Sequence, residues 1–301
     1  MVEKQYVKWG VGQRFEFIEW RCYWVGRVNR SDLEERFGVS TPQASLDLRA
    51  YQEAMPASIE YDMAEKAYVP QPGFQPSYLK LSADRYLIQL DAILNGAIPP
   101  GVTWFGSAPP SAVIPSVARS IEPGTLRAIL RAIDRRLELE VEYQSLTNTR
   151  RRMIAPHALA FDGYRWHARA WCVEHNDFRD FVLSRILSVG PSRSSKADPT
   201  NDVEWNTLVH MKITAHPALD AAQKSAIERD FGMKDGVRTI ETKAALTFYL
   251  ERRMNLDLDD EAVKPERKQI FLANLEEVRQ ARLSAKEESK RRVAAALGEQ
   301  T

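Results

Sequence analysis

The segment from residue 96 to 118 contains five prolines and no charged side chain, and it constrains the fold of this chain more than any other feature. Proline fixes φ and has no backbone N–H to donate, so this segment can form neither a regular helix nor a central strand. Its composition is typical of an ordered, stiff connection between domains. A second break lies between Gly190 and Pro199. We therefore expect folded blocks at 1–95, 119–190 and 205–301, consistent with about 100–200 residues per domain.

Charge is unevenly distributed along the chain. Residues 119–193 contain 13 arginines, no lysine and nine acidic residues, whereas residues 1–95 contain 11 basic and 13 acidic residues. Arginine is the planar donor that suits phosphate groups and stacked bases. The codon usage of a GC-rich genome would leave the same arginine excess, so composition alone favours neither explanation.

Several classes of protein are disfavoured from the start. The chain is 44% apolar, which is enough for ordinary cores and excludes wholesale disorder. No apolar run approaches the roughly 20 residues that a membrane span needs, and the first residues contain no signal core. Two cysteines, Cys22 and Cys172, cannot form a disulfide framework or a zinc site. We expect a protein of the reducing cytoplasm, without contact with a membrane.

The first block has the pattern of a helix-turn-helix. A helix is expected from about Val11 to Val28, followed by a short helix after Ser31, where Ser31 and Glu34 have capping-box spacing. Gly38 can take the left-handed conformation that ends a helix. A third helix opens at 40–42, with Thr41 as the expected cap and a core stripe formed by Ala44, Leu48, Tyr51 and Met55.

A short β-hairpin is expected next, with strands at 58–61 and 66–69, and then a helix over 76–94. Two helices, a tight turn and a hairpin together predict a winged helix-turn-helix. Because the third helix of such a module lies in the major groove, short and hydrogen-bonding side chains at its start are candidate DNA contacts. With one lysine of the hairpin they are Ser40, Thr41, Gln43, Ser45, Asp47, Arg49 and Lys66. The slightly negative charge of the block argues against strong non-specific binding, and a protein-binding three-helix module is the alternative.

The second block consists of short strands after a helix at 122–136. Strands are expected at 137–145, 151–159, 164–172 and 178–189, which together predict a small, strongly bent β-barrel. Alternation in the third strand places Trp166 on the core face, and places His167 and Arg169 on the opposite face.

The third block alternates helices and strands, with strands at 208–213 and 237–242 and helices at 219–231 and 244–254. A final charged helix at 274–297 has only a thin apolar stripe, which favours packing on a partner subunit. A solvated tail is the alternative. The expected fold class is therefore α+β multidomain: a winged helix-turn-helix, a small Sm-like β-barrel and an α+β C-terminal extension.

The second block resembles a known family. The runs Ile154-Ala155-Pro156-His157-Ala158-Leu159, Phe161-Asp162-Gly163-Tyr164-Arg165-Trp166-His167 and Phe178-Arg179-Asp180-Phe181-Val182-Leu183-Ser184-Arg185-Ile186 are similar to a WYL domain. Trp166-His167-Ala168 occupies the place of the Trp-Tyr-Leu that names the family, so histidine replaces the tyrosine. The order of the three blocks is most similar to repressors encoded beside the BREX and CBASS anti-phage systems.

This resemblance implies a homodimeric transcriptional repressor that binds an inverted-repeat, double-stranded DNA operator. It also implies that the WYL barrel binds a nucleic-acid-derived effector, such as single-stranded DNA or a nucleotide, through a polar pocket. Arginine can bind phosphate bidentately, and histidine or tyrosine can stack on bases. The candidate effector residues are Tyr143, Ser145, Arg152, His157, His167, Arg169, Arg179 and Arg185. Ion pairs at the barrel rim are the alternative role for several of them.

Catalytic patterns are missing from the sequence. It has no phosphate-binding glycine loop, no dinucleotide fingerprint, no nucleophile elbow and no metal-ligand spacing among its five histidines. We therefore expect no enzymatic activity, no cofactor and no metal. A transcriptional activator of the same architecture, or a nucleic-acid-binding accessory protein of a defence complex, are the alternative functions.

Overall fold

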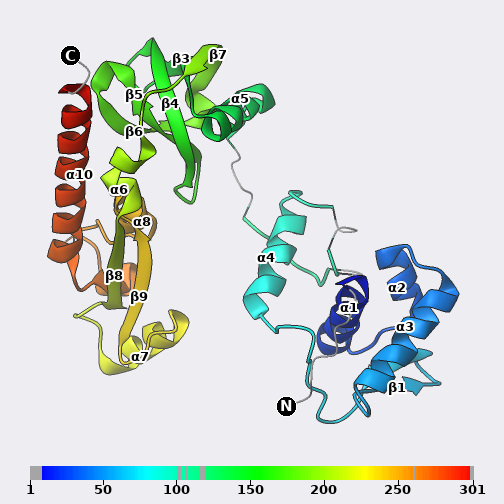
Figure 1. The fold of residues 1–301 in the computed structure, drawn as a ribbon. Coiled ribbons are helices and arrows are strands. Elements are labelled where there is room, and N and C mark those ends of the chain that lie inside the picture. The colour runs from blue at the N-terminus through cyan, green and yellow to red at the C-terminus, as the bar shows by residue number, and fades with distance from the viewer. Residues whose placement is uncertain (1–8, 100–102, 106–107, 115–118, 260–261, 299–301) are drawn as a thin grey trace. The chain divides into compact units, whose positions relative to one another are not determined.

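The computed structural model describes residues 9–99, 103–105, 108–114, 119–259 and 262–298. The chain divides into two compact units, Met1–Val117 and Ala118–Thr301 (Figure 1). The fold class expected from the sequence is confirmed: a winged helix domain is followed by a central sheet and a mixed C-terminal region.

The first unit begins with three helices, α1 (Trp9–Val25), α2 (Arg30–Phe37) and α3 (Thr41–Ala54). The capping box of α2 is formed by Asn29 and Asp32, so the expected pair Ser31 and Glu34 is wrong. Gly38 ends α2 at φ 63°, in the left-handed region that glycine tolerates best. Ser40, not Thr41, caps α3, because its hydroxyl accepts from the backbone N–H of Gln43. The turn between α2 and α3 is therefore fixed at both ends, because Gly38 terminates α2 and Ser40 caps α3.

The wing follows as β1 (Ile59–Asp62) and β2 (Ala67–Pro70), which pair antiparallel. The last helix of the unit, α4 (Ala83–Leu94), is shorter than the expected 76–94. The residues before it are held in another way: the fully buried carboxylate of Glu19 accepts the backbone N–H groups of Ser77, Tyr78 and Leu79 at 2.6–2.8 Å. The helix begins only after Ser82, whose hydroxyl accepts from the backbone N–H of Arg85 and caps α4.

Part of the proline-rich segment belongs to the first unit. Phe105 is buried against Trp20, with ring centroids 5.3 Å apart, and Trp104 packs edge-on to both Phe17 and Trp20. Residues 103–105 thus complete a hydrophobic cluster with α1 and α4, whereas the sequence predicted only an ordered, stiff connection between domains.

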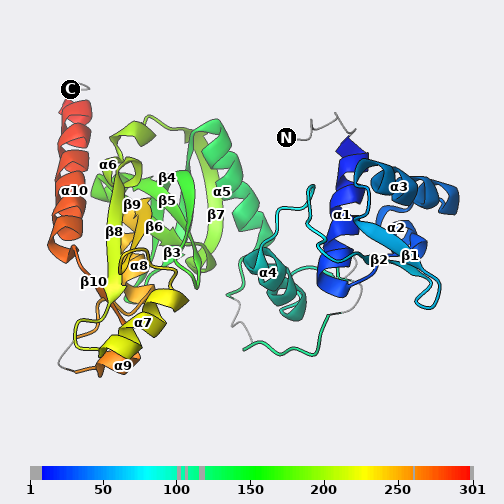
Figure 2. The same cartoon turned by 90° about the horizontal axis from the view of Figure 1, so that it is seen from below.

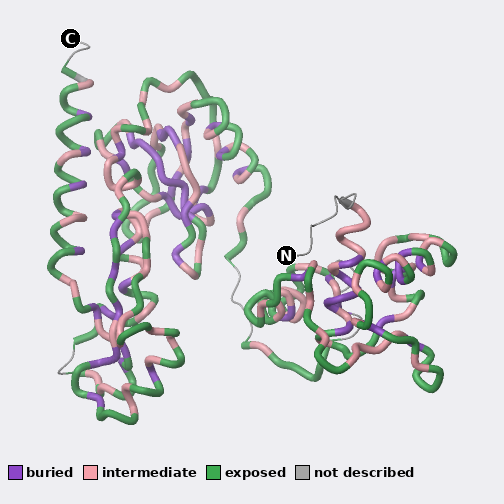
Figure 3. Tube along the Cα trace, turned by 60° about the horizontal axis from the view of Figure 1, so that its bottom comes forward, coloured by how far each residue is buried: buried purple, intermediate pink, exposed green. Residues whose placement is uncertain are grey.

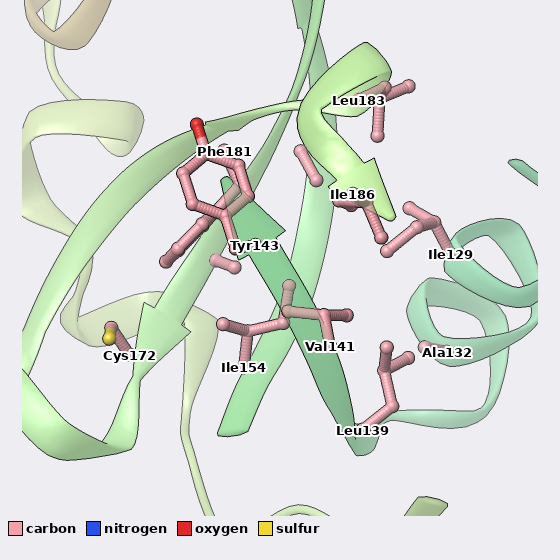
Figure 4. Close-up of a cluster of buried hydrophobic side chains, with 12 residues drawn as sticks. Ile129, Ala132, Leu139, Val141, Tyr143, Ile154, Cys172, Phe181, Leu183 and Ile186 are labelled. Atoms are coloured by element: carbon pink, nitrogen blue, oxygen red, sulfur yellow. The ribbon is translucent and has the colours of Figure 1, made fainter. Parts of the chain in front are cut away.

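The second unit begins with α5 (Pro123–Arg135) and a five-stranded antiparallel sheet in the order β6-β5-β4-β3-β7. Its strands are β3 (Leu137–Gln144), β4 (Thr149–Phe161), β5 (Trp166–Cys172), β6 (Asp177–Val182) and β7 (Ile186–Ser194). Bulges in β4 and between β3 and β7 bend the sheet around its core. Figure 4 shows that core: Ile129 and Ala132 of α5 face Val141, Ile154 and their neighbours on the strands.

Two expectations for this sheet are wrong. The single strand predicted at 178–189 is interrupted by a 3₁₀ turn, η3 (Leu183–Arg185), because β6 and β7 are the two edges of the sheet and the chain must cross between them. Trp166 is not in the core: it is 45% exposed and stacks on Phe161 at the end of the hairpin. Ala168, Ala170 and Cys172, on the same face of β5, are fully buried as expected.

The C-terminal region has a three-stranded sheet, β10-β8-β9, formed by β8 (Leu208–Ala215), β9 (Val237–Lys243) and β10 (Ile270–Leu272). Its helices are α6 (Val203–Asn206), α7 (Ala221–Asp230), α8 (Thr247–Arg253), α9 (Pro265–Lys268) and α10 (Leu275–Gly298), and the 3₁₀ turn η5 (Ala244–Leu246) leads into α8. Figure 2 shows α10 running along β8 and α6.

The long helix α10 is not a solvated tail, because part of its apolar stripe packs within its own chain, while Leu283 of that stripe is 53% exposed. Val278, Ala285 and Val293 are buried within their own chain, and Val293 reaches the cluster of Trp171 and Phe178 on the five-stranded sheet. The burial pattern along α10 alternates accordingly (Figure 3). Its thin stripe is therefore used to clamp the C-terminal region to the central sheet.

Candidate functional sites

The helix-turn-helix presents the start of α3 to solvent. Ala44, Leu48 and Tyr51 are fully buried, so the opposite side of α3 is turned outward. Thr41 and Arg49 on that side are exposed and Ser45 is half-buried, with its hydroxyl bonded to the carbonyl of Thr41 at 2.9 Å. These side chains can hydrogen-bond to bases or phosphates, which is how a recognition helix reads DNA.

Asp47 does not lie on this exposed face, and its expected position is wrong. It is 3% exposed, and Arg14 of α1 donates to its two oxygens at 2.6 and 3.1 Å. Gln43 also donates to it, from Nε2 to Oδ1 at 3.0 Å. The spacing contained the signal: Asp47 is three residues after Ala44 and four before Tyr51, which are both core positions.

A concave surface joins the start of α3 to the wing. This hollow, of about 360 Å³, is lined by Thr41 and Lys66 among the expected residues, and also by Asn29, Arg30, Ser31, Glu34, Tyr61 and Tyr68. Lys66 lies at the tip of the hairpin with φ 51°. Sequence reasoning missed Leu46, which is 56% exposed on α3 between Ser45 and the buried Asp47. An exposed leucine on a recognition helix offers apolar contact to a thymine methyl group.

Arg169 of β5 is at the centre of a buried charge network. It donates to Asp202 through Nε at 2.7 Å and Nη2 at 2.9 Å, and to Glu204 at 3.0 Å, with Asp180 3.5 Å away. Burial alone would lower the pKa of the guanidinium, but its carboxylate neighbours raise it, so Arg169 stays charged. Burial would raise the pKa of Asp202, and the hydrogen bonds from Arg169 and His157 outweigh it and lower that pKa.

The two histidines of the candidate set belong to the same buried layer. His157 Nε2 is 2.9 Å from Asp202 Oδ2, and His167 Nε2 is 2.9 Å from Asp162 Oδ2. Hydrogen bonds from Arg165 and His167 hold the pKa of Asp162 well below its ordinary value, against the effect of burial. The face of β5 expected to line an open pocket is therefore covered by the protein's own C-terminal region.

The remaining candidates are spread over the sheet. Tyr143 Oη accepts from the backbone of Val182 at 3.2 Å, Ser145 closes the turn to Asn148, and Arg152 contacts His175 at 2.7 Å. Arg185 of η3 is half-buried and forms no ion pair with the described residues. Of the eight expected residues, Arg169 and Arg179 line one common pocket.

That pocket is an open hollow of about 390 Å³ between β6, α6, α8 and α10. Its cationic side chains are Arg169, Arg179, Arg282 and Lys286, its acidic ones are Asp177, Asp180 and Glu204, and Phe178, Phe248 and Tyr249 supply aromatic surface. We call it the seam hollow. Burial raises the pKa of Glu204 despite its contact with Arg169. The sequence could not reveal this site, because it combines side chains from segments distant in the chain.

Among the residues that the structure describes, no three histidine, cysteine or carboxylate side chains cluster as a metal site would require. No described helix is both long and apolar enough to cross a membrane.

Three family models match this chain in order. Residues 10–92 match the BrxR transcriptional regulator winged helix-turn-helix domain, residues 124–191 match the WYL domain, and residues 208–278 match the BrxR transcriptional regulator C-terminal dimerization domain.

Curated relatives match over almost the whole length. The DNA-binding transcriptional repressor CapW of Escherichia coli (strain KTE188) is 39% identical over 280 residues, covering 91% of this chain and 93% of the relative. Proteins of the same name from Stenotrophomonas maltophilia and Pseudomonas aeruginosa are 38% and 39% identical, covering 91% and 92% of this chain and 93% of each relative.

Proposed function

The chain belongs to the family of WYL-domain DNA-binding transcriptional repressors with BrxR-type winged helix and dimerization domains, and from this we propose that it represses a phage-defence operon until a nucleic-acid-type ligand binds its second unit. Its role is regulatory and not enzymatic. The likeness of its three blocks to repressors encoded beside the BREX and CBASS systems supports the defence assignment.

The exposed start of α3 supports the assignment of DNA contacts. The side chains available to bases and phosphates are Thr41, Ser45, Leu46 and Arg49. The sugar-phosphate backbone of the DNA can be contacted by Arg30 and Lys66 beside the wing. A dimer held by its C-terminal domain presents two such helices, and a two-fold protein matches an inverted repeat. We assign the operator to such a repeat, with one recognition helix per half-site.

The seam hollow is the observation that supports ligand control. Arg179, Arg282 and Lys286 suit phosphate groups, and the exposed ring of Phe248 suits a stacked base. Its volume of about 390 Å³ is within the usual range for small-ligand pockets. We assign to it a short piece of nucleic acid or a nucleotide.

The position of the hollow supplies a route from ligand to dimer. Arg169 holds Asp202 and Glu204 at the start of α6, and α6 leads directly into β8 of the dimerization domain. A phosphate that approaches Arg169 competes with Glu204 for the guanidinium. Because a ligand shifts an equilibrium only through different affinities for the two states, this competition would favour a dimer geometry in which α6 is loosened.

A gel-shift titration on the DNA upstream of the gene, at fixed salt, tests the proposal. Wild-type protein should give a saturable, competitor-resistant shift that short single-stranded DNA releases. The variant R179A/K286A should bind the operator as wild type does but no longer respond to the oligonucleotide. R193A is the matched control, because Arg193 is an exposed arginine of β7 that does not line the hollow.

Each outcome has a separate meaning. Loss of release in R179A/K286A alone supports the seam hollow, and an unchanged response places the ligand elsewhere. If the wild-type protein gives no specific shift, the proposed binding to an operator is refuted and an accessory nucleic-acid-binding role is favoured. A reporter driven by the gene's own promoter should rise when the gene is deleted, and a fall would refute repression.

A further inference from the structure

The side chain of Gln43 is held in one orientation by a buried carboxylate. Nε2 of Gln43 donates to Oδ1 of Asp47 at 3.0 Å, and Asp47 lies four residues later on the same helix. An ionised carboxylate can only accept hydrogen bonds, so the nitrogen of the Gln43 amide must face Asp47 and the oxygen must face away from it.

Asp47 is itself fixed by the first helix. It is 3% exposed, and Arg14 Nε and Nη2 donate to its two oxygens at 2.6 and 3.1 Å. Two parallel bonds between a guanidinium and a carboxylate fix both planes. Hydrogen bonds from Arg14 to Asp47 and from Gln43 to Asp47 therefore connect α1 to the exposed start of α3.

This arrangement decides what Gln43 offers to a ligand. One hydrogen of Nε2 is committed to Asp47, and among the described residues none donates to Oε1. The amide thus presents one acceptor and one remaining hydrogen. Adenine presents the matching pair in the major groove, the N6 donor and the N7 acceptor, whereas guanine presents two acceptors.

We propose that Asp47, held by Arg14, is a positioning residue that sets the base preference of Gln43 to adenine. The inference rests on the proposed function, because it requires α3 to read the operator. It assigns no DNA contact to Asp47 or Arg14, which act through the orientation of the Gln43 amide.

The variant D47N should reverse the preference. Asparagine has one oxygen, which is expected to keep the 2.6 Å bond from Arg14 Nε. Its NH₂ group then takes the place of Oδ1, which removes the bond from Arg14 Nη2 and presents a donor to Gln43. The Gln43 amide therefore turns over and accepts with Oε1. Both hydrogens of Nε2 become available, and two donors match the two acceptors of guanine, N7 and O6.

The experiment measures the affinity of the full-length protein for operators in which each base pair of the half-site is changed symmetrically, at fixed salt. Wild type should prefer adenine at one position by about tenfold. Q43A should lose the preference at that position alone, and D47N should prefer guanine there. D32N is the control: Asp32 also pairs with an arginine of α1, at 2.8 Å, and belongs to the capping box of α2, but it does not touch Gln43, so the adenine preference of D32N should persist.

The outcomes separate the two proposals. If D47N is folded by circular dichroism and keeps the adenine preference that Q43A loses, the positioning role is refuted while the DNA contact stands. If Q43A keeps every preference, Gln43 reads no base and the inference is refuted. If wild type binds none of the operators, the proposed function itself is refuted. A shift toward guanine in D32N would show a general effect of lost ion pairs and would also refute the positioning role.

Discussion

The variant R169A tests whether the buried charge network holds the second unit together. Arg169 is the cation that faces Asp202, Glu204 and Asp180, and Asp202 is fully buried. Alanine removes the guanidinium that pairs with these carboxylates and leaves Asp202 with His157 and Asp180 with Tyr249. Breaking a buried ion pair by deleting one partner costs about 3–5 kcal/mol. For a unit of this size each kcal/mol lowers Tm by about 2–4 °C, so we expect a loss of roughly 6–20 °C.

Thermal unfolding followed by differential scanning calorimetry is the assay, because two units can give two transitions. Only the transition of the second unit should shift in R169A. The matched control is R193A, since Arg193 pairs with Glu138 at the surface with 68% of its side chain exposed. An exposed pair contributes at most about 1 kcal/mol, so R193A should shift Tm by no more than about 4 °C.

The pH dependence gives a second readout. In wild type the pKa of Asp202 is lowered, so its contribution is present above the unfolded pKa of about 3.9 and is lost as pH falls through the folded pKa. R169A removes the main group that lowers this pKa, and burial then raises it. Asp202 of R169A should therefore take up a proton at a higher pH than Asp202 of wild type, which relieves the cost. The stability difference between wild type and R169A should narrow as the pH is lowered. A loss below about 1 kcal/mol, or a difference that does not change with pH, would refute the reasoning.

Three further variants test single features of the two units. L46A should change the unfolding free energy by less than about 0.5 kcal/mol, because Leu46 is exposed. It should nevertheless weaken operator binding measured by fluorescence anisotropy. Equal binding by L46A and wild type would show that Leu46 does not contact DNA. E19Q should destabilise the first unit by about 1–3 kcal/mol in urea unfolding. The amide can keep its oxygen at the Oε2 position, so its NH₂ group faces the Tyr51 hydroxyl, which can turn to accept, and the N–H of Ser77, which loses its acceptor; a loss under about 1 kcal/mol would contradict this. G163A places a Cβ 2.7 Å from Cδ of Arg253, at a residue with φ 97°, so it should lower the Tm of the second unit. The double variant G163A/R253A should recover only part of that loss, because the backbone strain remains. Full recovery would show that the contact with Arg253 was the whole cost.

The sequence predicted local structure well wherever one face of an element decides its burial. The stripe of Ala44, Leu48 and Tyr51 correctly predicted the buried side of α3, and strict alternation predicted β3 and β5. Caps were less predictable, because Asn29 and Ser31 are both good capping residues and only the backbone decides between them.

The candidate site was less predictable than the fold. Alternation placed His167 and Arg169 on the opposite face from Ala168, which is correct, but it cannot distinguish solvent from a second protein layer. That layer comes from Asp202, Glu204 and Tyr249, which lie more than 30 residues away in the sequence. For the same reason the cationic residues Arg282 and Lys286 of the seam hollow had no local signal.

The choice of charged side chains for this junction fits a regulator better than a static domain. An apolar junction of the same size would often be as stable or more stable, because a buried ion pair must recover the cost of desolvating both charges. A network of Arg169, Asp202 and Glu204, however, can respond to an added anion, whereas packed apolar side chains have no group for which an anion can compete. On the proposed function, binding at the seam hollow gives Arg169 a phosphate partner in place of Glu204, whose carboxylate loses its bond to the guanidinium. The differential affinity that control of the dimer requires then comes from the contact of the ligand with Arg169, which is available only when Glu204 has given up its bond to the guanidinium.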